Sequence, residues 1–192
     1  MLTTLLELQR LKRLDRTGWT LRGQMPGAET VAAHSYGVVV TAMLLADEVA
    51  RRGVDVNVER VLRLAVLHDW AEARTGDLPR AVLHYYGADT RRAAEEHAFS
   101  DIIEPLGAAQ AEKLSSLHEE YENRATLEAR LVKAADVIDL LMQALMFERA
   151  GARGLDEFWE NATALDFKRD GAAGEIVSEI LKGLAEERAK LK

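Results

Sequence analysis

The stretch LHDWAEARTGDLP, residues 67–79, sets His68, Asp69, Glu72 and Asp77 among leucine, alanine and tryptophan neighbours. Its periodicity predicts the last turns of a helix, followed by a Thr-Gly-Asp-Leu-Pro turn. Neighbouring residues on a helix lie about 100° apart around its axis, so His68 and Asp69 can bind one ion that sits beside the helix between them. Glu72 would stand one turn further on, close to such an ion and free to act on a molecule bound to it.

The same helical periodicity runs along most of the 192 residues, and no convincing strand pattern interrupts it. The sequence has no internal repeat, low-complexity tract or linker, and we expect a single all-α domain over residues 1–192, a compact helical bundle with its core in about residues 30–150. Gly53 and Gly151 are expected to end two of the helices, and Asn57 to begin one. The expected helices cover about residues 2–14, 30–52, 58–74, 88–105, 108–123, 126–150, 155–165 and 172–190, with a loop over 18–27.

Two of the expected helices, Val31–Ala46 and Leu131–Phe147, are apolar on nearly every side. A helix of this kind is normally buried, so its few polar residues are informative. The polar residues of the second helix fall on one stripe, at spacings of three, three and four: Lys133, Asp136, Asp139 and Gln143. Because unpaired buried charges are costly, this stripe must face a partner, an ion or a water-filled cleft.

Four side chains on three apolar helices form a candidate site for a divalent transition metal: His34, His68, Asp69 and Asp136. Each has a simpler interpretation when taken alone. His34 would be a core residue, the His-Asp pair a chance neighbour, and Asp136 the ion-pair partner of Lys133. The joint pattern favours the metal site, because a His, a His-Asp pair about 34 residues later and an Asp about 68 residues beyond all fall in apolar helices.

Composition narrows the class of protein. The chain is 48% apolar, carries a formal charge of −7 and has no cysteine, which excludes disulfides and thiolate sites. The acidic balance argues against a nucleic-acid polymer as a partner, but not against a small anionic ligand. No apolar run is long enough to span a membrane, and the N-terminal residues lack the order of a signal peptide. We therefore expect a cytoplasmic protein that binds neither membranes nor nucleic-acid polymers.

The order His, His-Asp, Asp resembles the pattern of the HD-domain metal-dependent phosphohydrolases. Within that superfamily, further segments are similar to the small 5′-deoxynucleotidase family: LDRTGW (14–19), HSYGVVV (34–40), HDWAEARTGDLP (68–79), VKAADVIDLLMQALMFE (132–148) and EIVSEILKGL (175–184). The resemblance covers most of the chain. It implies an enzyme that hydrolyses deoxyribonucleoside 5′-monophosphates to deoxynucleoside and phosphate through a metal-activated water. It also implies one divalent transition metal, such as Mn²⁺ or Co²⁺, and a homodimer, which would cover apolar helix surface.

The resemblance also implies roles for single residues. The four candidate ligands match the family's metal ligands, and Glu72 and Asp77 match its catalytic acidic residues. Glu72 is placed to orient or deprotonate the water, while Asp77 could hydrogen-bond that water or serve the leaving 5′-oxygen. Trp19 matches an aromatic residue that contacts the sugar and favours 2′-deoxy substrates.

Three basic residues are candidates for binding the substrate phosphate. Gly18 directly precedes Trp19, at a position where the bacterial form of the family has an arginine. Arg16 is therefore the first choice for the substrate-binding arginine, and Arg22 is the alternative. Lys133 either binds the phosphate or forms an ion pair with an aspartate of its own stripe.

Two other functions use the same residues: an HD-superfamily phosphodiesterase or nucleotide pyrophosphohydrolase, and a non-catalytic nucleotide-binding protein. The presence of all the ligands and of both acidic residues argues against the non-catalytic protein. The spare histidines, His84, His97 and His118, are expected on the surface or in structural positions, which favours one metal over two. Trp70 and Trp159 are expected in the core or at an interface.

Overall fold

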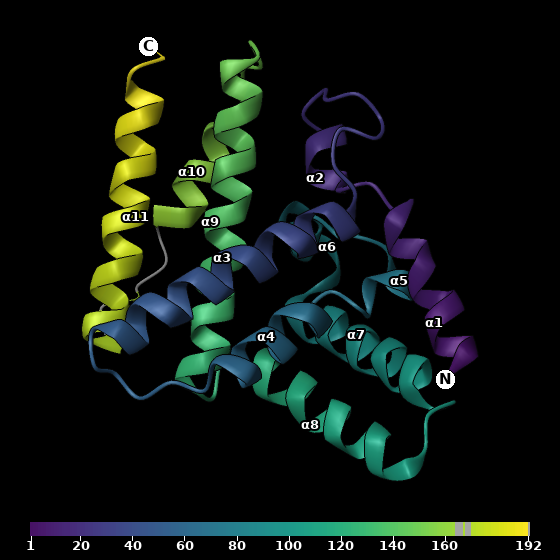
Figure 1. The fold of residues 1–192 in the computed structure, drawn as a ribbon. Helices are drawn as coiled ribbons and strands as arrows, with labels where there is room; N and C mark the ends of the chain where they lie inside the picture. The colour runs from purple at the N-terminus through teal and green to yellow at the C-terminus, as the bar shows by residue number, and fades with distance from the viewer. Residues whose placement is uncertain (164–166, 168–169, 192) are drawn as a thin grey trace.

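The computed structural model describes residues 1–163, 167 and 170–191, and all of its regular secondary structure in those residues is helical (Figure 1). A single isolated bridge joins Asp15 and Thr30. The all-α prediction is confirmed. The helices are α1 (Leu2–Leu8), η1 (Gln9–Lys12), α2 (Thr17–Thr20), α3 (Val31–Arg51), α4 (Val58–Leu67), α5 (Glu72–Thr75), η2 (Arg80–Val82), α6 (Leu83–Tyr86), α7 (Ala88–Ile103), α8 (Ala108–Asn123), α9 (Leu127–Arg149), α10 (Asp156–Thr163) and α11 (Ala172–Ala189).

The long helices begin and end at residues suited to those positions. The side chains of Thr30, Asn57 and Thr126 each accept a hydrogen bond from the backbone N–H three residues later, at the starts of α3, α4 and α9. Gly53 and Gly151 follow α3 and α9 with φ values of 82° and 103°, a conformation that glycine adopts without strain. The cap predictions for Gly53, Asn57 and Gly151 are therefore confirmed.

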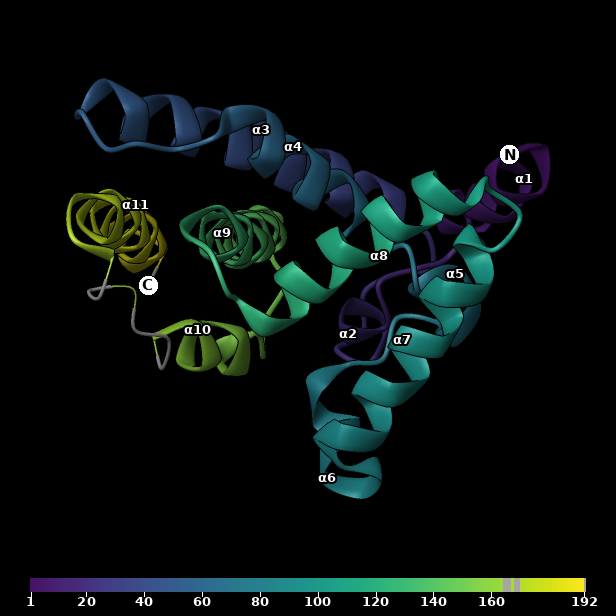
Figure 2. The same ribbon diagram turned by 90° about the horizontal axis from the view of Figure 1, so that it is seen from below.

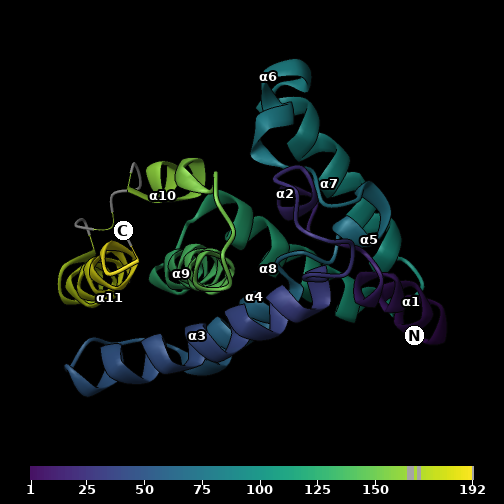
Figure 3. The same cartoon turned by 90° about the horizontal axis from the view of Figure 1, so that it is seen from above.

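The core forms where α3 crosses α9, with α4 and α11 packed against this pair (Figure 1). Seen from below and from above, α9 and α11 lie side by side, and α7 and α8 form an antiparallel pair that meets α9 through α8 (Figures 2 and 3). Large side chains that fill this core include Val38, Leu45, Val49, Leu64, Leu131, Ile138 and Val177. Apolar burial of this extent is the main source of the fold's stability.

The helix expected over 58–74 is wrong at its end. α4 stops at Leu67, His68 is its C-cap residue, and a turn leads to the four-residue α5. In that turn the N–H of Trp70 donates to the carbonyl of Leu67 at 3.1 Å, and the N–H of Glu72 donates to that of Asp69 at 3.1 Å. Asp69 therefore lies in a turn and not in a helix, and Glu72 begins a separate helix, α5.

Other boundaries also differ. The expected helix 2–14 turns into the short η1, and the loop expected over 18–27 begins with α2. The expected helix 155–165 corresponds to α10, and its last two residues lie outside the described part of the chain.

The expectation that Val31–Ala46 is buried all round is wrong for this chain. Tyr36 is 74% exposed and Leu44 60%, and both lie on the face of α3 that points away from the core. Met142 and Met146, on the C-terminal half of α9, are exposed as well. Among the described residues, no helix combines the length and apolar character that crossing a membrane requires.

Candidate metal centre and active site

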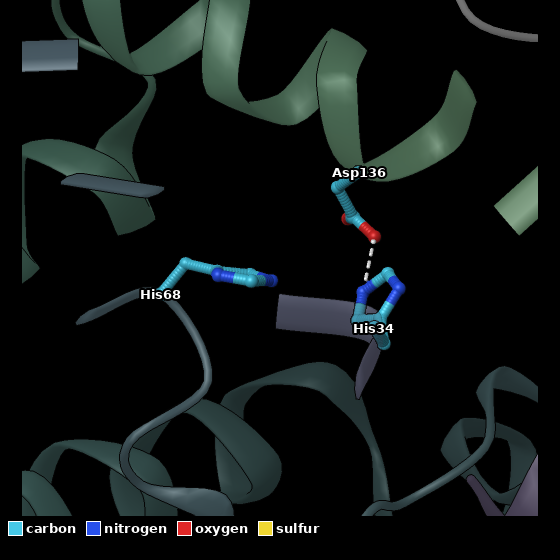
Figure 4. A group of neighbouring side chains, drawn as sticks. All are labelled: His34, His68 and Asp136. Carbon is cyan, nitrogen blue, oxygen red and sulfur yellow. Dashed lines mark ion pairs between the residues drawn. The ribbon is translucent and has the colours of Figure 1, made fainter. Parts of the chain in front are cut away.

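Three helices bring the predicted ligands together. His34 projects from α3, His68 from the end of α4 and Asp136 from α9, and the three side chains converge (Figure 4). His34 Nε2 lies 3.3 Å from Asp136 Oδ1, and the possible ligand atoms of the three residues all lie within 4.8 Å of one another. Asp69 Oδ2 lies 3.1 Å from His68 Nε2 and 3.7 Å from His34 Nε2.

These atoms fit a divalent metal. His34 Nε2, His68 Nε2 and Asp69 Oδ2 are buried, and none has a hydrogen-bond partner among the described residues. Buried polar atoms without a partner are costly, so their gathering at one point needs an explanation. Ligands about 2.0–2.2 Å from a single ion would show this spacing, and two imidazoles with two carboxylates suit a borderline transition metal.

Each histidine turns its other ring nitrogen toward a fixed acceptor. His68 Nδ1 lies 2.8 Å from the carbonyl oxygen of Ala65, and His34 Nδ1 lies 2.8 Å from Asp139 Oδ2. A proton held on Nδ1 leaves Nε2 with a free lone pair. Both rings are therefore oriented as metal ligands require.

The electrostatics of the centre favour a cation. Burial and Arg16 would lower the pKa of His34, but the carboxylates of Asp136 and Asp139 outweigh them and raise it to about 9. Burial would raise the pKa of Asp69 and of Asp136, but neighbouring positive groups outweigh it and hold both well below their ordinary values. A divalent ion would supply the positive charge that these carboxylates favour.

Glu72 is the first residue of α5 and is 6% exposed. Its Oε2 is buried with no hydrogen-bond partner in the described residues. Burial, followed by the charges of Asp69 and Asp77, raises the pKa of Glu72 well above its ordinary value. A raised pKa makes a carboxylate a stronger proton acceptor, which suits acid–base chemistry.

Asp77 holds the loop that carries Arg16. Gly76 precedes it with a φ of 78°, and this left-handed turn directs the Asp77 side chain inward. One oxygen of Asp77 accepts from Arg16 Nη1 at 3.0 Å, and the other accepts from the backbone N–H of Thr17 at 2.6 Å. Both oxygens of Asp77 thus face the segment before α2.

The three predicted phosphate-binding residues lie at different places. Arg16 is 15% exposed, and its Nη1 lies 3.8 Å from Oδ2 of the candidate ligand Asp69. Lys133 Nζ lies 2.6 Å from Asp136 Oδ2, so the predicted ion pair is present. Lys133 also lines the pocket, where it could contact a phosphate as well. Arg22 instead pairs with Glu157 of α10.

A pocket of about 800 Å³ opens over this centre. Trp19 forms part of its wall but is only 2% exposed, because its ring packs against Phe147 and Phe158. The indole N–H of Trp19 donates to Glu29 at 2.5 Å. The ring is therefore held rigidly, and only the small exposed part of it can contact a ligand.

The far wall of the pocket was missed by the sequence analysis. His118 was expected on a solvated face, but it is buried against the ring of Phe99, with 4.0 Å between the ring centres. It lines the pocket together with Tyr121 and Arg91. The helical spacing of Leu117 and Tyr121, which are both buried, was the available signal for this inward face.

The other unassigned residues follow the predictions more closely. His84 and His97 are exposed, on α6 and α7. Trp159 is buried, and Trp70 packs against the core with its ring stacked on Phe99.

A known protein family matches most of this chain. The sequence model of the HD-domain family, described as "HD domain", matches residues 8–169. The chain belongs to the HD-domain family. The family membership predicted from the His, His-Asp, Asp pattern is thereby confirmed.

Relatives that are named as enzymes are similar to this chain over most of its length. The 5′-deoxynucleotidase HDDC2 of Xenopus laevis is 34% identical over 93% of this chain and 82% of its own length. The 5′-deoxynucleotidase hdd1 of Schizosaccharomyces pombe is 33% identical over 79% of this chain and 75% of its own length. Among solved structures, the PH0347 protein of Pyrococcus horikoshii OT3 is 33% identical, covers all of both chains and superposes with a TM-score of 0.78.

Proposed function

We propose that this protein is a metal-dependent 5′-deoxynucleotidase, which hydrolyses deoxyribonucleoside 5′-monophosphates to deoxynucleoside and phosphate. The observation that carries the proposal is the convergence of three buried ligand atoms, from His34, His68 and Asp69, which have no hydrogen-bond partner in the described part of the chain and lie beside a pocket that Arg16 lines. The relatives named 5′-deoxynucleotidase support the substrate class.

In this proposal His34, His68, Asp69 and Asp136 hold one divalent metal such as Mn²⁺ or Co²⁺. A metal bound there would offset the negative charge of the phosphate and lower the pKa of a water molecule. Arg16 and Lys133 neutralise the remaining phosphate charge. Glu72 accepts the proton of the attacking water as the water oxygen bonds to phosphorus, and Glu72 then gives this proton to the leaving 5′-oxygen as the bond between that oxygen and phosphorus breaks.

Asp77 and Trp19 have supporting roles toward substrate in the proposal. Asp77 keeps Arg16 over the centre through their hydrogen bond of 3.0 Å. Trp19 packs against the deoxyribose with its exposed edge and leaves no room for a 2′-hydroxyl. The ring's burial between Phe147 and Phe158 supports this role, because a rigid wall discriminates by shape.

We also propose that the protein is a homodimer located in the cytoplasm, with one HD domain spanning the chain. Support for the dimer comes from one apolar face that this chain leaves uncovered, formed by Tyr36, Met43 and Leu44 of α3 with Met142 and Met146 of α9. Apolar faces of this kind mark protein interfaces in soluble proteins. Light scattering tests the dimer: we expect twice the mass of the chain, and a stable monomer would disprove it.

Phosphate release from a panel of nucleotides tests the activity. The protein is stripped with EDTA, and Mn²⁺, Co²⁺, Mg²⁺ or Zn²⁺ is added back with deoxynucleoside monophosphates, nucleoside monophosphates or a bis-ester. We expect metal-restored release from deoxynucleoside monophosphates only, and its loss in Glu72→Gln. Release from no monophosphate would disprove the proposal, and cleavage of the bis-ester alone would indicate a phosphodiesterase.

A further inference from the structure

Asp139 approaches the metal centre from behind His34. It lies on α9 three residues after Asp136, and its Oδ2 lies 2.8 Å from His34 Nδ1. The imidazole is 1% exposed and the carboxylate 13%, so solvent competes little for this hydrogen bond. The contact holds the Nδ1 proton and turns Nε2 toward Asp136 and Asp69.

This approach depends on Gly37 of α3. A Cβ atom on Gly37 would lie 2.0 Å from Asp139 Oδ1 and 2.7 Å from its Cγ, far closer than nonbonded atoms can approach. Gly37 is not among the residues with positive φ, so its backbone conformation does not require glycine. A glycine inside a 21-residue helix is unfavourable relative to alanine, and the space for Asp139 gives a reason for it.

Glu29 completes the cluster behind His34. Possible ligand atoms of Glu29, His34 and Asp139 lie within 4.8 Å of one another, a spacing that a second cation could also use. The hydrogen bonds favour another explanation, because Glu29 accepts from Trp19 and Asp139 lies at hydrogen-bond distance from His34. The cluster therefore orients groups of the pocket instead of binding an ion of its own.

We propose that Gly37 and Asp139 are a positioning pair for the metal centre: Gly37 leaves room for the Asp139 carboxylate, which fixes the His34 ring for metal binding. The inference rests on the proposed function, because it requires a metal at His34. It assigns neither residue a contact with substrate or metal.

Metal affinity of the purified, EDTA-stripped protein tests the pair. Mn²⁺ and Co²⁺ are titrated against a chelating dye for the wild type, Asp139→Ala, Gly37→Ala and the double variant. We expect each single variant to bind metal about 10–100-fold more weakly, a range typical of lost partners of a metal-bound histidine. The double variant should bind no more weakly than Asp139→Ala, because no carboxylate remains for the new methyl group to displace.

Gly183→Ala is the matched control. Gly183 lies inside α11, and a Cβ atom there would meet nothing within 4 Å. We expect unchanged metal affinity and a slightly higher Tm, as for an ordinary helical glycine. Losses that add fully in the Gly37→Ala, Asp139→Ala double variant would overturn the pairing, since independent sites add.

Two further measurements test the role of Asp139 independently of Gly37. Asp139→Asn keeps the size and one acceptor oxygen, so we expect a smaller loss than in Asp139→Ala, and it tests the role of Asp139 if Gly37→Ala does not fold. In the Zn²⁺-loaded protein, the Nδ1 proton of His34 should give a low-field NMR signal that Asp139→Ala lacks.

Three results would overturn the inference, and they differ in what they mean for the proposed function. Wild-type affinity in Asp139→Ala, with phosphate release retained, would overturn only the pair. Two metals per chain, one of them lost in Asp139→Ala, would show that the cluster behind His34 is itself a metal site. A wild-type protein that binds no metal would disprove the proposed function as well.

Discussion

The candidate site is built from two regions that hold their side chains in different ways. His34 and Asp136 stand inside helices of 21 and 23 residues, with helical backbone on both sides. His68, Glu72 and Asp77 instead lie where α4 ends and short turns follow. The first region is held by the core itself, whereas the second depends on contacts from other parts of the chain.

This difference suggests that the two regions have different roles in the site. Side chains on long, packed helices are fixed by the packing of the whole bundle, which suits the ligands His34 and Asp136. The segment after α4 is held by single contacts, such as those from Arg16 to Asp69 and Asp77. We therefore expect His34 and Asp136 to be indispensable for metal binding, and Glu72 to act mainly on the reaction.

The largest expected effect comes from the helical region. Asp136→Ala removes the carboxylate between His34 and Lys133 and should abolish metal binding, with phosphate release falling about 10⁴-fold. Elemental analysis and a phosphate assay measure the two losses, and circular dichroism checks the fold. Asp47→Ala, an exposed acid on α3, is the control and should behave as the wild type. Retained metal in Asp136→Ala would contradict the ligand role.

A smaller effect is expected in the turn region. Glu72→Gln removes the proton acceptor but keeps the size of the side chain, so we expect phosphate release to fall about 10³-fold. Metal affinity should stay within about 3-fold of the wild type, because Glu72 acts beside the ligands. Chelator competition and a rate assay on the same samples measure both. If Glu72→Gln lost the metal as completely as Asp136→Ala, the proposed division between the regions would be wrong.

The two arginines give the next largest expected difference. Arg16→Ala should lower kcat/KM about 10²-fold, because Arg16 is the arginine that pairs with Asp69 and Asp77 at the centre. Arg22 also lines the pocket, but its ion pair is with Glu157 and not with the acidic centre, so Arg22→Ala should change kcat/KM by less than about 3-fold. Steady-state kinetics of both variants measure the two losses in kcat/KM. Equal losses would place Arg22 at the phosphate too.

Sequence reasoning was most successful where local chemistry and tertiary structure agree. Asn57 begins α4, and Gly53 and Gly151 follow α3 and α9, as their local chemistry predicted. The spacing of His34, the His-Asp pair and Asp136 predicted their convergence because His34 and Asp136 interrupt apolar helices and the pair directly follows another helix. A ligand set of this kind requires no detailed geometry to be recognised.

The failures have a common physical cause, which is dependence on distant parts of the chain. The end of α4 at Leu67 is not marked by a glycine or proline, and the turn after it is stabilised by contacts from residues near Arg16. His118 is buried by Phe99, which lies on another helix. The exposed apolar face with Tyr36 could not be distinguished from a core face, because periodicity does not say what covers a surface.

The smallest expected effect concerns the end of α4 far from the turn. Glu120 of α8 is 7% exposed and accepts hydrogen bonds from Arg60, through Nε at 2.8 Å and through Nη2, and from Thr126 at 2.5 Å. Glu120→Gln should lower the free energy of unfolding by about 1 kcal/mol, since a charged acceptor becomes neutral. Phosphate release below the melting temperature should not change, because this contact lies on the helical scaffold outside the pocket.

The pH dependence of this stability loss distinguishes a charge effect from a packing effect. Burial would raise the pKa of Glu120, but hydrogen bonds from Arg60 and Thr126 outweigh it and lower the pKa below its ordinary value of 4.5. The unfolded chain therefore binds the proton more readily, so the stabilisation is complete above pH 4.5 and is lost as the pH falls through the lowered pKa. Urea unfolding should show a difference between the wild type and Glu120→Gln at pH 7 that shrinks in acid. A difference that stays constant into acid would mean that Glu120 stabilises α4 through its shape and not its charge.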